Sequence, residues 1–149
     1  MEEDDLNGGY DPRQLQLIHL TLLVGQLVFF ILSFYILKDD PNARHGFDFR
    51  SLWFYIIPAA AGLLNYWGGV MFWRRLAQLD SWEDLQDKLR ALTNAHLVRW
   101  AIVEVSTLLL LTFAIFQSSW FFLLLGMANI VYFFFLRPRL FTFDSGLEG

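Results

Sequence analysis

The chain has 149 residues, of which 56% are hydrophobic, 18% are aromatic and only 17% are charged. A soluble domain is typically about 45–50% apolar with about a quarter of its residues charged, so this composition argues against a soluble protein and favours a membrane protein. The absence of cysteine excludes disulfides, iron–sulfur clusters and thiolate metal sites, and the net charge of −4 gives no reason to expect a nucleic-acid partner.

The chain begins with an acidic tail, residues 1–11. Its acidic residues are Glu2, Glu3, Asp4, Asp5 and Asp11. Polar segments of this kind are typically solvated. The tail is unlike a signal peptide, which begins with basic residues and ends at a small-residue cleavage site. We therefore expect the apolar stretch that follows to be retained as a helix.

Four apolar stretches follow the tail, at residues 15–37, 52–73, 97–116 and 120–136. Helices of roughly 17–23 residues, rising about 1.5 Å per residue, match a hydrocarbon core of about 30 Å. A soluble bundle would need a polar stripe on each helix, which these stretches lack. The sequence thus predicts an all-α fold, an integral membrane four-helix bundle. We expect one domain over residues 12–140, with helices at about 12–37, 52–75, 95–117 and 119–137, and a C-terminal tail at 141–149.

The connections between these helices predict two antiparallel hairpins. Residues 38–50 are polar and rich in turn formers, which suits a loop between the first two helices. The last two helices are joined only by residues 117–119, which requires a tight antiparallel turn.

The loop between the second and third stretches contains a pattern typical of an amphipathic helix. Residues 81–84 resemble a capping box, and apolar residues then recur at helical spacing. We expect an interfacial helix at about 81–94 on the cytoplasmic membrane surface, anchored by Trp82, Leu85 and Leu89. The alternative for the same residues is a docking site for a partner protein.

Basic residues are distributed unequally between the two ends of the predicted helices. One end has Arg13, Arg74, Arg75, Lys88, Arg90, Arg99, Arg137 and Arg139, whereas the other has only Lys38, Arg44 and Arg50. The positive-inside rule then places both termini and the middle loop in the cytoplasm. We expect a multi-pass protein of the bacterial inner membrane.

Each apolar stretch carries one strongly polar side chain well inside it, namely Gln26, Asn65, Glu104 and Asn129. Counted from the cytoplasmic ends, all four lie about 10–15 Å deep at about 1.5 Å per residue. Ser106 and Thr107 follow Glu104 closely. Because small and polar residues mark the interior of a membrane bundle, the sequence predicts one polar layer where the helices meet.

Glu104 is expected at the centre of this layer. A charged acid at that depth costs about 2.5–3.5 kcal/mol, which favours the neutral form that donates a hydrogen bond to an amide. One interpretation is an accessory or structural membrane subunit whose polar layer sets helix register. The alternative is a proton- or cation-handling protein that uses Glu104 as its protonatable site. The expected partners are the lipid bilayer and either other membrane subunits or further copies of this chain.

No catalytic site, cofactor or metal site is expected. Glu104 is the only deep acid, so no Ser–His–acid arrangement can be assembled, and no glycine-rich phosphate loop is present. His19 and His96 fall near the cytoplasmic ends of their helices and could face each other as haem ligands, although a lone interfacial histidine is far commoner. We therefore do not expect an enzyme.

The sequence resembles two protein families, one over a single helix and one over the whole chain. Residues 99–116 (RWAIVEVSTLLLLTFAIF) resemble the carboxylate-bearing helix of rotary ATPase proteolipid (c-type) subunits, and this implies an ion site formed by Glu104, Gln26 and Ser106 or Thr107. The whole chain resembles a family of small four-helix membrane proteins common in Bacteroidota. That resemblance is carried by a His-Leu-rich first helix, by residues 99–104 and by Arg137-Pro138. It implies the fold only, because that family has no assigned activity.

Overall fold

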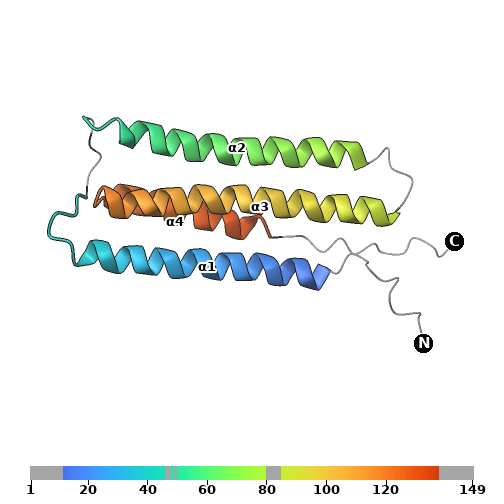
Figure 1. Cartoon of the computed structure of the whole chain (residues 1–149), viewed down its shortest axis with the longest axis horizontal. Coiled ribbons are helices and arrows are strands. Elements are labelled where there is room, and N and C mark those ends of the chain that lie inside the picture. Colours follow the sequence, from blue (N-terminus) through green and yellow to red (C-terminus); the bar gives the residue numbers. More distant parts are fainter. Residues whose placement is uncertain (1–11, 46–47, 49, 80–84, 138–149) are drawn as a thin grey trace.

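The structure of the chain is a computed structural model that describes residues 12–45, 48, 50–79 and 85–137. These residues form four helices and no strand: α1 (Pro12–Lys38), α2 (Trp53–Leu79), α3 (Leu85–Phe116) and α4 (Trp120–Phe135). Figure 1 shows the helices lying alongside one another, with α1 and α3 running in one direction and α2 and α4 in the other. The all-helical, four-helix prediction is confirmed for this part of the chain.

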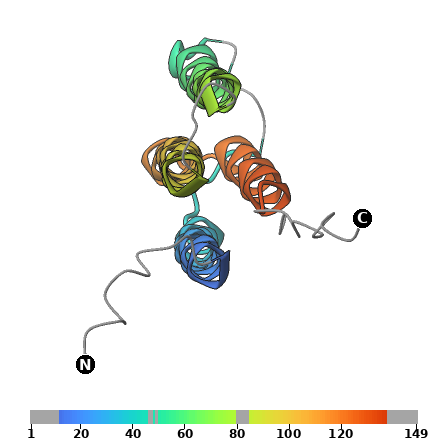
Figure 2. The same ribbon diagram turned by 90° about the vertical axis from the view of Figure 1, so that its right-hand side faces the viewer.

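The order in which the helices pack differs from the predicted pair of hairpins. Seen along the helices in Figure 2, α2 and α1 lie on opposite sides of the pair formed by α3 and α4. Helix α3 packs against each of the other three helices, and α1 packs against α3 and α4. The last two helices form the expected hairpin, whereas the first two are separated and do not.

The loop between α1 and α2 explains this separation, because it crosses the turn that joins α3 to α4. The Arg44 N–H donates to the Ser118 carbonyl at 2.7 Å, and the Trp120 N–H donates to the Arg44 carbonyl at 3.0 Å. Ser118 adopts a left-handed backbone conformation with φ of 45°, as a tight turn requires. We call these two backbone bonds the loop–turn contact. Since the loop is held across the turn, α2 starts on the far side of the α3–α4 pair.

Helix α3 is longer than predicted, because it includes much of the segment assigned to an interfacial helix. It runs without a break from Leu85 to Phe116, over 32 residues. That range contains neither glycine nor proline, so nothing in the sequence interrupts it. A separate helix ending near residue 94 is therefore not formed. Leu89 is half-buried on α3. Trp82 lies outside the described residues, as does residue 81, where the predicted helix begins.

The core consists of two apolar clusters that follow the α3–α4 pair. One is centred on Phe54 and Phe122, whose ring centroids are 4.7 Å apart, and continues to the fully buried Leu111. The other contains the buried residues Leu15, Trp100, Val103 and Phe133, near the opposite end of the helices. The polar cluster described below lies between these two apolar regions along α3.

Large apolar side chains also cover the outside of the molecule. Exposed examples come from every helix, among them Val28, Trp67, Val105 and Phe135. By length and composition, two helices are apolar enough to cross a membrane, over Arg13–Lys38 and Asp87–Phe116. Helix α4 is also apolar but shorter, with 16 residues.

Candidate functional site

Asn129 on α4 is the centre of a buried polar cluster. Its Nδ2 lies 2.7 Å from Ser106 Oγ, 2.8 Å from Thr107 Oγ1 and 3.2 Å from the Val103 carbonyl, all on α3. Ser106 and Thr107 are fully buried and Asn129 is 7% exposed. One amide group thus contacts three acceptors within little more than one turn of α3, which fixes the height of α4 against that helix.

Asn65 adds α2 to this cluster and closes a ring of hydrogen bonds. Asn65 Nδ2 donates to Asn129 Oδ1 at 2.6 Å, and Ser106 Oγ lies 2.8 Å from Asn65 Oδ1. Asn65 therefore donates to Asn129, Asn129 donates to Ser106, and Ser106 can donate back to Asn65. Hydrogen bonds that run in one direction around a ring polarise one another and become stronger. We call Asn65, Ser106, Thr107 and Asn129 the polar cluster.

Close packing of α3 and α4 brings the polar cluster together. Gly126 lies one turn before Asn129, and a Cβ atom at this glycine would be 2.5 Å from Leu111 Cδ2. The absence of a side chain at Gly126 therefore allows the two helices to approach closely enough for the short hydrogen bonds of Asn129. This is the small-residue contact that membrane helices commonly use.

Glu104 lies beside the polar cluster rather than at its centre, which corrects the sequence-based expectation. It is half-buried and makes no hydrogen bond or ion pair with the described residues. Successive residues are about 100° apart around a helix, so Ser106 is about 200° from Glu104. Ser106 therefore faces α2 and α4 while Glu104 faces another side. Arg99 is turned towards Phe72 and Tyr132 and does not pair with Glu104.

Gln26 is also outside the polar cluster. It is fully buried, and neither its Oε1 nor its Nε2 atom has a hydrogen-bond partner in the part of the chain that the structure describes. The rings of His19 and Trp100, 5.0 Å apart, set the register of α1 against the parallel α3. From this contact Gln26 is seven residues along α1 and Glu104 is four along α3, a difference of about 4.5 Å in height. Gln26 and Glu104 therefore lie about one helical turn apart in height on two neighbouring helices.

The two histidines considered as haem ligands have packing roles. His19 lies 3.1 Å from the Phe133 carbonyl through Nε2 and stacks on the Phe133 ring, with centroids 4.6 Å apart. His96 packs against Phe72 and Trp100. Among the described residues no group of three or more potential ligands could hold a metal ion.

The sequence named all four members of the polar cluster but missed a second feature, a groove between α1 and α4. Its lining includes Arg13 and Arg137, which the sequence analysis used only to assign orientation. The only sequence signal for this groove was the presence of basic residues near the ends of two different helices. The proximity of these two helix ends could not be known before the packing order.

No known protein family, curated protein sequence or solved structure matches this chain. The features of the molecule that bear on its function are the polar cluster, the two polar residues outside it (Gln26 and Glu104) and the apolar outer surface.

Proposed function

We propose that this chain is a small multi-pass membrane protein that serves as an accessory or structural subunit, with its helices held in register by the polar cluster. The observation that carries the proposal is the closed ring formed by Asn65, Ser106 and Asn129, which joins α2, α3 and α4. The polar atoms of the ring bind one another. They are therefore suited to hold helices together rather than to bind a substrate.

The membrane location is supported by the apolar outer surface. In water the exposed side chains of α1, such as Val28 at 61% and Leu32 at 52%, would be unfavourable, whereas in lipid they need no cover. With α1 and α3 spanning the bilayer, α2 and α4 lie alongside and span it too. Helix α4 is short at 16 residues, a mismatch that tilting of its neighbours or local thinning of the bilayer accommodates.

The orientation follows from the charges at the two ends of the helices. Arg13, Arg74, Arg75, Lys88 and Arg137 are at the end where α1 and α3 begin, the right-hand end of Figure 1. The other end has Lys38, Arg44 and Arg50, with Asp39, Asp40 and Asp48 among them. The more basic end therefore faces the cytoplasm of a bacterial inner membrane.

A structural role agrees with the energetics of polar groups in lipid. An amide that loses its partner inside a bilayer cannot turn to water, so polar groups on neighbouring helices stay paired. Such a cluster sets rotation and height for each helix and so presents a defined outer surface. Other membrane subunits or further copies of this chain would bind that surface.

Alkaline extraction of membranes and sizing in mild detergent test this proposal. We expect the chain to stay in the membrane at pH 11 and to migrate as a complex larger than the 17.5 kDa monomer. An Asn129→Ala variant should lose that complex while it remains in the membrane. Release by alkali would contradict the membrane location, and a monomer in membrane-mimicking detergent would contradict the subunit role.

A second candidate function, proton or cation handling, is supported by Glu104 and Gln26. Among the described residues, neither the fully buried Gln26 amide on α1 nor the half-buried Glu104 carboxyl on α3 has a hydrogen-bond partner, and a proton or cation site uses polar groups of this kind. In this alternative Glu104 is the protonatable group and Gln26 is its neighbour. The two functions differ in one respect that can be measured, because only the second requires Glu104-dependent transport.

A further inference from the structure

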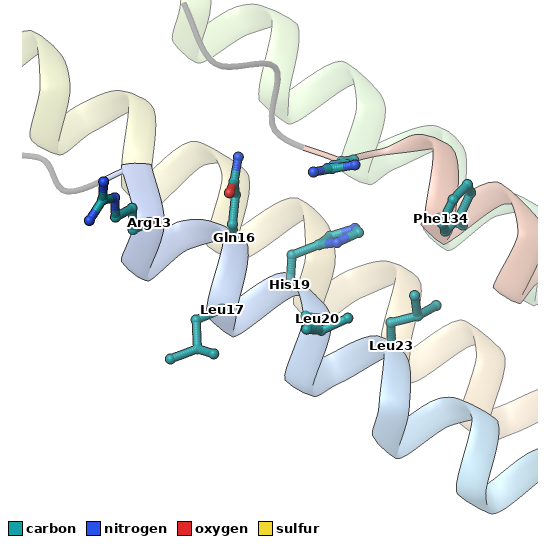
Figure 3. A pocket seen from close by; sticks show the side chains of 8 residues that line it. Arg13, Gln16, Leu17, His19, Leu20, Leu23 and Phe134 are labelled. Carbon is teal, nitrogen blue, oxygen red and sulfur yellow. The ribbon is translucent and has the colours of Figure 1, made fainter.

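The side of α3 that points away from α4 is not covered by another described helix. Figure 2 shows α3 at the edge of the bundle, with α4 beside it and α2 and α1 above and below. Figure 3 shows His19 and Leu23 on the side of α1 that faces α4, so α1 is turned towards the α4 side of α3. Ala101, Val105 and Leu108 are exposed on the uncovered side, Val105 at 56%. We call this side the outer face of α3.

The outer face of α3 has the residue spacing of a helix–helix contact. Ala101, Glu104 and Leu108 follow one another at intervals of four residues or fewer, three and then four. This is the spacing with which two helices pack side by side at a small angle, in membranes as in coiled coils. Ala101 and Leu108 point within about 20° of each other, and Glu104 lies about 60° from Ala101 towards α1. The small side chain of Ala101 allows a second helix backbone to come close.

Glu104 lacks a hydrogen-bond partner on this face. Its half-buried carboxyl makes no hydrogen bond or ion pair with the described residues. Counted from the contact of His19 with Trp100, the residue at its height on α1 is the apolar Leu23. A polar group at membrane depth cannot turn to water, so acids there are paired with other polar groups. The partner of Glu104 must then come from another molecule.

A second copy of this chain supplies a polar group at the matching depth. Copies inserted with the same orientation can pair about a two-fold axis along the membrane normal, which places each residue opposite itself at equal depth. Asn65, Ser106 and Asn129 are occupied by one another, and Gln26 is fully buried. Among the strongly polar side chains at this level, Glu104 is the one on the outer face. A neutral carboxyl has an O–H donor and also accepts, so two of them are complementary.

We propose that the outer face of α3 binds a second copy of this chain, with the two Glu104 carboxyls hydrogen-bonded to each other across a two-fold axis. Ala101 and Leu108 pack against their counterparts on either side of this pair. The inference rests on the proposed function, because it names the partner of the structural subunit and requires the membrane location. It also gives Glu104 a role that involves no ion transport.

Cross-linking between copies tests the contact. The chain has no cysteine, so single-cysteine variants report on one position each. In membranes oxidised with copper phenanthroline, Ala101→Cys and Leu108→Cys should each give a disulfide-linked dimer, because residues on a two-fold seam bring their Cα atoms within the roughly 7 Å that a disulfide spans. The matched control is Leu63→Cys on α2. Leu63 is 68% exposed and lies near the same depth, two residues from Asn65, which binds Ser106. It should stay monomeric.

Replacements of Glu104 test the hydrogen bond itself. Energy transfer between two labelled populations of the full chain in liposomes, at varied protein-to-lipid ratio, measures dimerisation. Glu104→Leu should weaken it by about threefold to 30-fold, the range expected for a hydrogen bond between membrane helices. Glu104→Gln should dimerise nearly as well as the unchanged chain, because two amides also pair. The carboxyl has no bond within its own copy, so both variants should keep the same helix content by circular dichroism.

Several results would overturn the proposed dimer. Cross-linking of Leu63→Cys as readily as Ala101→Cys would show random collision. Equal dimerisation of Glu104→Leu and the unchanged chain would show that the carboxyls do not pair. A complex in mild detergent without cross-linking at Ala101 or Leu108 would mean that the subunit role stands but uses another surface or a different protein. Release from the membrane by alkali would contradict the proposed function as well, so the two failures are distinguishable.

Discussion

Asn129 is the residue on which the packing of three helices depends. Replacement by alanine removes the acceptor of Asn65 Nδ2 and the donor to Thr107 Oγ1 at once. A buried polar group left without a partner costs about 1–3 kcal/mol, and less where Ser106 can still bind Asn65. We expect Asn129→Ala to lower the free energy of unfolding in detergent by about 1–3 kcal/mol, measured by titration with sodium dodecyl sulfate.

Glu104→Ala is the matched comparison for Asn129→Ala. Glu104 is at nearly the same depth but has no hydrogen-bond partner among the described residues, so its removal should leave stability unchanged or raise it. A larger loss for Glu104→Ala than for Asn129→Ala would show that Glu104 belongs to the polar cluster in solution.

The common level of Asn65, Asn129 and Ser106 could be predicted from sequence, whereas the rotation that leaves Glu104 outside the polar cluster could not. Gln26, Asn65, Glu104 and Asn129 were placed at one level by counting residues from the helix ends. Counting does not give the rotation of each helix about its axis, and a rotation of about 60° decides whether Glu104 or Thr107 meets Asn129. That rotation is set by contacts such as that of Gly126 with Leu111, which only the folded packing reveals.

At the scale of the elements, the close approach of α3 and α4 at Gly126 makes a testable prediction. Gly126→Ala would place a methyl group 2.5 Å from Leu111 Cδ2, and Leu111 is itself fully buried and cannot move away freely. Overpacking of this kind costs about 1–3 kcal/mol. We expect a lower midpoint of unfolding for this variant in detergent.

Gly69→Ala is the control for Gly126→Ala. Nothing lies within 4 Å of a Cβ atom at Gly69, so the same substitution adds only helix propensity there. It should be neutral or stabilising by up to about 1 kcal/mol. Equal effects of the two substitutions would argue against close packing at Gly126.

The loop–turn contact should depend on pH through Asp40. The Ser118 hydroxyl and the Asn42 N–H donate to its carboxylate and hold the pKa of Asp40 below its ordinary value of 3.8. Because the folded pKa is depressed, the ionised carboxylate stabilises the contact above pH 3.8, and this stabilisation is lost as the pH falls through the folded pKa.

Hydrogen exchange measures this effect at the amides of Arg44 and Trp120, which form the contact. Asp40→Asn should speed their exchange at pH 7, and the difference from the unchanged chain should disappear in acid. A difference that persisted at pH 2 would mean that the carboxylate charge is not the cause.

The existence of four helices could be predicted from apolar length, and their order in space could not. The turn at residues 117–119 is too short for anything but a hairpin, so α3 and α4 were paired correctly. The loop between α1 and α2 is long enough to place α2 on either side of the α3–α4 pair. Its course is set by the backbone hydrogen bonds of Arg44 with Ser118 and Trp120, which no sequence pattern predicts. The segments expected as adjoining helices at about 81–94 and 95–117 share one continuous helix from Leu85 to Phe116, because an amphipathic pattern does not by itself end a helix.

At the scale of the whole molecule, the proposed orientation can be tested by labelling, because the chain has no cysteine of its own. A single cysteine at Asn42 should react with a membrane-impermeant maleimide added to intact cells. A single cysteine at Ala77, in the last turn of α2 at the basic end of the bundle, should react only after the cells are opened. Reaction of both positions from outside would contradict a bundle that spans the membrane from end to end.

We propose that this bundle has a structural role in the membrane and that Glu104 does not move ions. Proton flux into liposomes that contain the purified chain tests it most directly, with a potassium diffusion potential as the driving force and an internal pH-sensitive dye as the reporter. The unchanged chain, Glu104→Gln and protein-free liposomes are compared at equal lipid content. We predict the same slow flux in all three. A faster flux with the unchanged chain that returns to the protein-free rate with Glu104→Gln would contradict this account.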